Sequence, residues 1–260
     1  MDFNAASSSS FQDQIRKANS FLEGWKLRPN LTQLMFLNLA FPNNENLTRE
    51  DIADICALKI NKFPQLQSLA LSFWNCQPFD DELLNVLCSQ GLIQLTQLVS
   101  LNLNLGWCTS ITDRGINHLC LKGLRNLLKL KNLNLNLNSL FLITDKGAEI
   151  LCTQGLRYVE QLESLNLDLS AFEIADETIN VLCSQGLKYL HQLTSLDLSL
   201  EECPQLTDEG INNFCFNGIK QLPQLVSLKL SFCNCPRISK FTTINIQKVL
   251  RYFGFVPESS

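Results

Sequence analysis

Histidine and charge are scarce in this sequence, which has only two histidines and 18% charged residues in 260 positions. Few histidines leave few candidates for general acid–base catalysis. The formal net charge of −4 argues against a protein that works by clamping phosphates. The apolar runs are short and broken by Asn, Lys or Gln, whereas a membrane span needs roughly 18–20 continuous residues. The sequence therefore predicts no nucleic-acid partner and no membrane partner.

Signals for export and for catalysis are missing too. The first ten residues have no basic segment followed by an apolar one, so we expect no secretory signal. The chain contains no G-x-G-x-x-G, no phosphate-binding G-x-x-x-x-G-K-[ST], no G-x-S-x-G and no H-E-x-x-H. His118 and Cys120, two residues apart, would lie about 200° apart on a helix, and we expect His118 and His191 at the surface. We predict no catalytic residue, no cofactor and no metal, hence no enzyme.

Leucine and asparagine are abundant instead, with 50 and 25 residues. Seven segments share the pattern L-x-x-L-x-L-x-L/F at steps of 32, 32, 32, 32, 31 and 32 residues. They cover residues 34–41, 66–73, 98–105, 130–137, 162–169, 193–200 and 225–232. Alternation places the leucines on one face of a short strand, and strands from successive repeats would stack as a parallel sheet.

A second motif follows each predicted strand. The run from Ile111 to Ile116 reads I-T-D-R-G-I, and similar runs begin at Ile143 and Leu206. Threonine is a good N-cap residue, and aspartate in the first turn favours the positive end of a helix. Apolar or small residues then follow at i, i+3, i+4, i+7, i+8 and i+11, which predicts one amphipathic helix per repeat.

Together the two motifs resemble the leucine-rich-repeat family over about residues 31–255. The I-T-D-x-G-I…L-C run is similar to the cysteine-containing class, which is common in substrate-recognition subunits of ubiquitin ligases. The repeat length is nearer to the ribonuclease-inhibitor type. The resemblance implies an α/β leucine-rich-repeat solenoid, a horseshoe of about seven 32-residue repeats with a concave parallel sheet and convex helices.

The ends of a solenoid need caps, because each exposes apolar core. We expect a disordered N-terminus over residues 1–10 and an N-terminal capping helix over 11–30. The repeats would occupy 31–240, and a C-terminal capping helix and tail 241–260. The last expectation rests on a new apolar stripe at Ile246, Val249, Leu250 and Phe253.

The eleven cysteines fit the repeat. One slot lies on the inward helix stripe and is filled by Cys56, Cys88, Cys120, Cys152, Cys183 and Cys215. A second slot lies in the loop after the strand and holds Cys76, Cys108, Leu140, Phe172, Cys203 and Cys235. A site that accepts Cys, Leu or Phe is apolar, which predicts buried reduced thiols and a reducing, cytoplasmic location. A disulfide or metal at Cys76/Cys108 or Cys203/Cys235 is the alternative.

The alternation also directs three columns of small polar residues to the concave face. The candidate partner-binding residues in these columns are Asn102, Asn104, Asn132, Asn134, Asn136, Asn166, Asp168, Asp197 and Lys229. The alternative is a merely solvated sheet face. At the rim after the strands, Trp74, Trp107 and Phe141 are candidate anchors, because aromatic residues dominate binding hot spots. The alternative is that each aromatic covers the core of its own loop.

The resemblance implies a non-catalytic protein–protein interaction module, a monomer that acts as adaptor, inhibitor or substrate receptor. A second resemblance, to the Asn-, Gln- and Leu-rich repeats of proteins that intracellular bacteria inject into host cells, implies an effector translocated into a host. A different function is a glycan or small-ligand receptor, in which the Asn/Asp/Ser floor binds hydroxyl groups.

Overall fold

The computed structural model describes residues 34–41, 48–56 and 62–252. In this part of the chain seven strands form one parallel sheet in chain order. The strands are β1 (Phe36–Ala40), β2 (Ser68–Ser72), β3 (Ser100–Asn104), β4 (Asn132–Asn136), β5 (Ser164–Asp168), β6 (Ser195–Ser199) and β7 (Ser227–Ser231). The expected disordered start and N-terminal capping helix, residues 1–10 and 11–30, lie outside the described residues.

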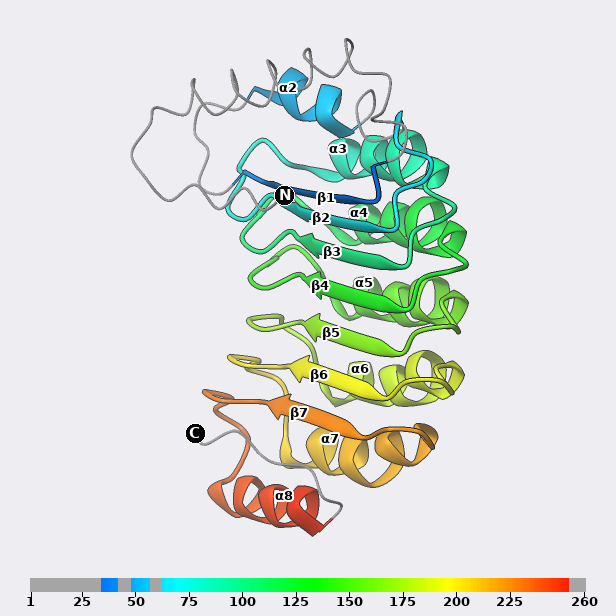
Figure 1. The fold of residues 1–260 in the computed structure, drawn as a ribbon. Coiled ribbons are helices and arrows are strands. Elements are labelled where there is room, and N and C mark those ends of the chain that lie inside the picture. The colour runs from blue at the N-terminus through cyan, green and yellow to red at the C-terminus, as the bar shows by residue number, and fades with distance from the viewer. Residues whose placement is uncertain (1–33, 42–47, 57–61, 253–260) are drawn as a thin grey trace, which may run out of the picture.

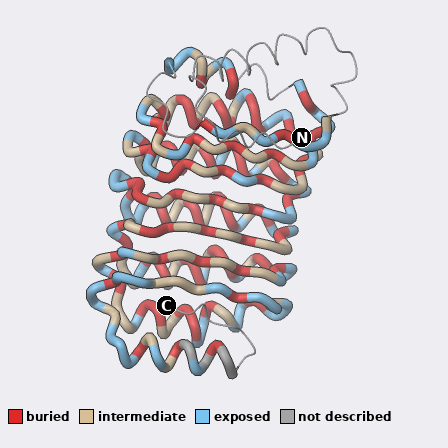
Figure 2. The backbone as a smooth tube through the Cα atoms, turned by 60° about the vertical axis from the view of Figure 1, so that its left-hand side comes forward, coloured by how far each residue is buried: buried red, intermediate tan, exposed pale blue. Residues whose placement is uncertain are grey.

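In the sheet, each residue of a strand pairs with the residue at the equivalent position of the next repeat. Each strand leucine lies beside the equivalent leucine of the next repeat, as Leu101 beside Leu133, and the single 31-residue step places Leu165 beside Leu196. In β2 to β6 these leucines are at most 2% exposed, and the residues between them are less buried; Leu39 in β1 and Leu230 in β7 are only partly buried (Figure 2). The alternation therefore predicted the strands and their buried face correctly.

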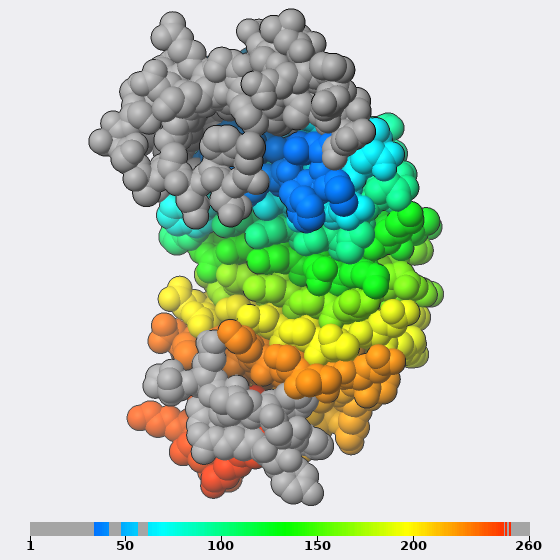
Figure 3. Space-filling model, viewed as in Figure 1, coloured from blue at the N-terminus to red at the C-terminus, as the bar shows by residue number. Residues whose placement is uncertain are grey.

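The helices form a second layer behind the sheet, as Figure 1 shows. They are α2 (Arg49–Asp54), α3 (Asp81–Val86), α4 (Asp113–His118), α5 (Asp145–Ile150), α6 (Asp176–Val181), α7 (Asp208–Asn213) and α8 (Lys240–Tyr252). The repeats follow one another as bands from one end of the molecule to the other (Figure 3). Each repeat therefore packs mainly on its two neighbours in sequence.

Each repeat from α3 to α7 has the expected helical stretch, but the stretch is not α-helical throughout. From α3 to α7 the α-helix continues as a five-residue π-helical segment and ends in a short 3-10 turn, as in Leu119–Gly123 and Leu124–Asn126 after α4. The N–H of Leu124 donates to the carbonyls of both Leu119 and Cys120, which widens the turn. Leu119, Cys120 and Leu124 are all fully buried on the sheet side.

Both cysteine slots are buried, as expected for apolar sites. The six helix cysteines are at most 4% exposed, and in the loop slot Leu140 and Phe172 are as buried as the cysteines. The thiols are free, and in the loop slot Cys108 Sγ donates to the carbonyl of Phe73 at 3.0 Å. Cys233, outside both slots, is the exposed thiol among the described cysteines.

A repeated glycine lets neighbouring helical segments approach closely. Gly155 ends the π-helical segment Leu151–Gly155, and a Cβ placed there would lie 2.8 Å from Cys120 Sγ in the preceding repeat. At Gly186 the nearest atom to such a Cβ would be 3.3 Å away, so this contact is looser. The glycine slot is therefore both a segment end and a site of helix–core contact.

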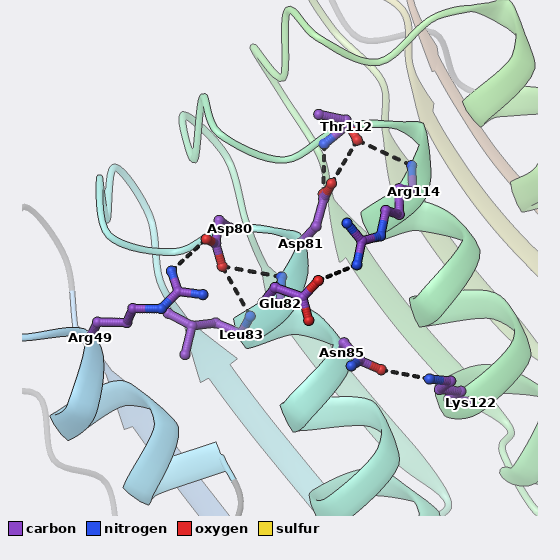
Figure 4. A network of polar contacts seen from close by, with 9 residues as sticks. All are labelled: Arg49, Asp80, Asp81, Glu82, Leu83, Asn85, Thr112, Arg114 and Lys122. Atoms are coloured by element: carbon purple, nitrogen blue, oxygen red, sulfur yellow. Dashed lines mark hydrogen bonds and ion pairs between the residues drawn. The ribbon is translucent and has the colours of Figure 1, made fainter.

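The Thr-Asp motif does two jobs at once. Thr112 caps α4, because its side chain accepts a hydrogen bond from the N–H of Arg114. The carboxylate of Asp81 in the preceding repeat accepts from the N–H and the hydroxyl of Thr112, at 2.8 and 2.7 Å (Figure 4). Asp113 binds Thr144 in the same way. Sequence reasoning assigned the aspartate only to its own helix.

Further polar contacts join these helix starts. Arg114 forms an ion pair with Glu82, and Arg49 with Asp80 (Figure 4). These side chains are between 30% and 64% exposed, so solvent screens each pair and each contributes little stability on its own. Both ion pairs join the helix start of one repeat to that of the next.

The repeat that contains α6 differs from the Thr-Asp motif at two positions. Ala175 stands where α4, α5 and α7 have the capping threonine, and Thr178 stands where these three helices have glycine. Asp145 accepts hydrogen bonds from the N–H of Ala175, at 3.2 Å, and from the hydroxyl of Thr178. The carboxylate thus keeps one backbone and one hydroxyl donor, although the hydroxyl comes from a different residue.

Helix α8 lies at the end of the array, beyond β7, and packs on α7 (Figure 1). Ile246 and Leu250 are buried, while Phe241 and Ile244 are exposed. The predicted stripe at Ile246 and Leu250 thus faces the core. No helix among the described residues is long and apolar enough to cross a membrane.

Candidate functional site

The floor of the candidate site is the sheet face turned away from the helices. In β4 the leucines are buried, while Asn132 is exposed and Asn134 and Asn136 are half-buried. The middle column of the floor runs through Ala70, Asn102, Asn134, Asn166, Asp197 and Lys229 in direct register. Three of these six residues are asparagines, and Asp197 and Lys229 have opposite charges, so the column is close to neutral.

In the column nearest the strand ends, the side chains hydrogen-bond to the backbone of the turn that follows their own strand. Asn104 Oδ1 accepts a hydrogen bond from the N–H of Gly106 at 3.0 Å, and Asn136 Oδ1 accepts from Asn138 at 2.9 Å. Asp168 does the same with Ser170 at 3.0 Å. Sequence reasoning missed this role, although Asn or Asp two residues before a turn is a known signal for it.

The loops after the strands form a second ladder of hydrogen bonds. One residue per loop has a left-handed backbone: Asn75, Trp107, Ser139, Ala171, Glu202 and Asn234, with φ between 55° and 62°. The N–H of Trp107 donates to the carbonyl of Asn138 at 2.9 Å, and that of Asn75 to Gly106 at 2.8 Å. The ladder links successive loops, so the rim is as regular as the sheet.

The three rim aromatics lie in these loops and are exposed, and Trp107 is itself part of the ladder. Trp74, Trp107 and Phe141 are 36%, 44% and 55% exposed, and Leu142 beside them is 54% exposed. The rings of Trp107 and Phe141 meet edge to face, with centroids 6.0 Å apart. The loop cores beneath are filled by Cys76, Cys108, Leu140 and their neighbours. An apolar surface therefore spans three adjacent loops.

The remaining loops carry carboxylates. Glu173 and Glu202 are exposed, and Glu201 accepts a hydrogen bond from the hydroxyl of Ser231. Asp197 and Lys229 lie side by side on β6 and β7. The rim thus changes from apolar to acidic along the array.

His118 departs from the expectation of a surface histidine. Its side chain is partly buried on α4, and Nε2 is shielded from solvent with no hydrogen-bond partner among the described residues. Burial, followed by the charges of Lys122 and Arg114, lowers the pKa of His118. His191 is exposed, as expected.

The thiols are poor nucleophiles in this setting. Burial raises the pKa of Cys152, Cys183 and Cys215 to about 12, so all three are protonated at neutral pH. The described residues contain no group of three or more His, Cys, Asp or Glu side chains arranged to hold a metal ion.

No protein-family model and no curated protein matches the sequence. Among solved structures, a chain of the yeast Rad7–Elc1 complex is similar at 18% identity and a TM-score of 0.42, over 93% of this chain and 78% of that one. Internalin C2 of Listeria monocytogenes is similar at 19% identity and a TM-score of 0.34, over 77% and 80%. A leucine-rich-repeat protein of Leptospira interrogans gives 16% and 0.22, over 86% and 85%.

These likenesses concern the fold alone. The parallel sheet in chain order and its 31- to 32-residue period carry the assignment. The chain folds as an α/β leucine-rich-repeat solenoid. In this solenoid the amide floor and the apolar rim lie next to each other along the strand ends.

Proposed function

We propose that this solenoid is a non-catalytic protein-interaction module that binds a protein partner through its concave face and rim. The observation that carries the proposal is the exposed aromatic surface of Trp74, Trp107 and Phe141 on a hydrogen-bonded rim. Aromatic anchors on a rigid support bind at low entropic cost. The floor residues Asn102 and Asn134 supply amides that a partner backbone can approach.

The finer role we propose is that of an adaptor, a competitive inhibitor or a substrate receptor, acting as a monomer in a reducing cytoplasm. The buried, protonated thiols support the reducing location. The I-T-D-x-G-I…L-C motif supports the cysteine-containing class, and the Asn- and Leu-rich repeats support an effector that acts inside a host cell.

A glycan or small-ligand receptor is the second candidate, and the floor is the observation that favours it. Asn102, Asn132, Asn134 and Asn166 place amide groups on neighbouring strands, where they could hydrogen-bond hydroxyls. Binding to a glycan array in the low-micromolar range, retained in W107A, would favour this candidate over the first.

The experiment that tests the proposal is capture of partners from cytosolic extract by the immobilised full chain, read by quantitative mass spectrometry. The variants are W107A, the floor pair N102A/N134A, and L128A. Leu128 is 70% exposed and precedes β4, away from the rim, so L128A is the matched control.

We expect one set of proteins captured by the wild type and L128A and lost from W107A. If all variants capture the same proteins, the surface is wrong. If no protein exceeds bare resin, the proposed function itself is contradicted.

A further inference from the structure

Three loop positions carry aromatic residues early in the array and carboxylates later. The position of Trp74, eight residues after the first leucine of its repeat, is occupied by Glu201 four repeats later. The left-handed position of Trp107 is occupied by Glu202. The position of Phe141 is occupied by Glu173 in the next repeat. The same rim therefore has an apolar half after β2–β4 and an acidic half after β5 and β6.

The acidic half is available to a partner. Glu173 and Glu202 are exposed, and neither takes part in any of the ion pairs found within the described residues. Glu201 accepts one hydrogen bond from the hydroxyl of Ser231 and belongs to none of these ion pairs either. A cationic segment would complement these three carboxylates.

The spacing of the two halves sets the size of the segment. Parallel strands lie about 4.8 Å apart, so the four steps from the loop after β2 to the loop after β6 span about 19 Å. The rim ladder keeps the same step, because Trp107 donates to Asn138 and Ala171 to Glu201 of successive loops. An extended chain rises about 3.3 Å per residue, so about six residues cover this length.

From these observations, and resting on the proposed function, we infer that the rim binds an extended polypeptide segment of mixed apolar and basic character. Its apolar side chains contact Trp74, Trp107 and Phe141. Two or more Arg or Lys side chains, about three residues further along, contact Glu201 and Glu202. The middle column of the floor, with Asn134 and Asn166, faces the backbone of the bound segment.

The test uses a phage-displayed library of random 12-residue peptides as the probe and the immobilised full chain as bait. The wild type, E201K/E202K, W107A and L128A are each put through the same selection, and the thermal unfolding of each variant is recorded. Enriched peptides are then synthesised, and their Kd is measured at 50 and 300 mM NaCl.

We expect the wild type and L128A to enrich peptides with two apolar residues within about three positions of two or more Arg or Lys. Their Kd should rise at least threefold at the higher salt, because screening weakens exposed charge pairs. E201K/E202K should bind the same peptides at least tenfold more weakly and should enrich acidic ones. W107A should enrich peptides without the apolar pair.

This inference would be overturned if the wild type enriched peptides without basic residues. It would also be overturned if the wild type and E201K/E202K enriched the same peptides. Failure to enrich any peptide would overturn it as well. In either case a positive capture from extract that is lost in W107A would leave the proposed function standing, so the two failures are distinguishable.

Discussion

At the scale of single residues, Trp107 combines backbone strain with exposure. Its φ of 62° lies in the left-handed region, which costs a bulky residue on the order of 1–2 kcal/mol. Asn75 and Asn234 hold the same position in other repeats, and asparagine tolerates this conformation well. The loop therefore does not need tryptophan for its shape, which fits a role in binding.

We predict that W107N changes the free energy of unfolding by less than about 1 kcal/mol. Relief of strain offsets the lost contact with Phe141, since an aromatic pair contributes about 0.5–1.5 kcal/mol. Binding of a captured partner should weaken by about 2 kcal/mol or more, roughly 30-fold in Kd. Urea unfolding and calorimetric titration measure the two effects.

The control for W107N is L135A, at a buried leucine of β4. That change should cost about 2–5 kcal/mol of stability by opening a cavity. If W107N destabilises the protein as much as L135A and leaves binding intact, Trp107 is a core residue and the rim assignment is wrong.

At the scale of elements, a cysteine sulfur in one repeat packs against a glycine in the next, which lets adjacent helical segments approach closely. Cys120 Sγ occupies the space that a Cβ on Gly155 would need, at 2.8 Å. A helical glycine is normally less stable than alanine by about 1 kcal/mol. The close contact reverses this preference at Gly155.

We predict that G155A lowers the free energy of unfolding by about 1–3 kcal/mol, because the added methyl forces the segments apart. The double variant C120A/G155A should be more stable than the sum of the two single changes, with a coupling of at least about 0.5 kcal/mol. G186A, where the space is larger, should be close to neutral. Equal losses in G155A and G186A would show that the contact with Cys120 is not the cause.

At the scale of the whole molecule, the rows of buried thiols make stability depend on alkaline pH. Burial raises the pKa of Cys152, Cys183 and Cys215 to about 12, against about 8.5 in an unfolded chain. Above pH 8.5 the unfolded state therefore loses thiol protons that the folded state keeps. The stabilising contribution is fully present below pH 8.5 and is lost as pH rises towards 12.

We predict that the free energy of unfolding falls between pH 8.5 and 10.5 by up to about 1.4 kcal/mol per pH unit for each buried thiol. Urea unfolding in the presence of reductant at several pH values gives the slope. C152A/C183A should flatten the slope, because two titrating groups are removed while Lys and Tyr are unchanged. Identical slopes in wild type and variant would contradict the prediction.

Periodicity alone determined much of this protein. The alternating leucines gave the seven strands, their register and their buried face, because side chains alternate strictly along a strand. The exchange of Cys for Leu140 and Phe172 identified the loop slot as apolar. The same alternation along the strands placed Asn102, Asn134 and Asn166 on the open face of the sheet. Whether these residues and the rim aromatics bind a partner stays a prediction.

Only the tertiary structure decided the features that depend on a neighbour one repeat away. These include the hydrogen bonds that Thr112 donates to Asp81 and the fit of Gly155 against Cys120. The left-handed backbone at Trp107, whose N–H donates to Asn138 in the next loop, belongs here too. A single repeat contains neither the partner atom nor the constraint, since both arise when parallel strands set the repeats about 4.8 Å apart.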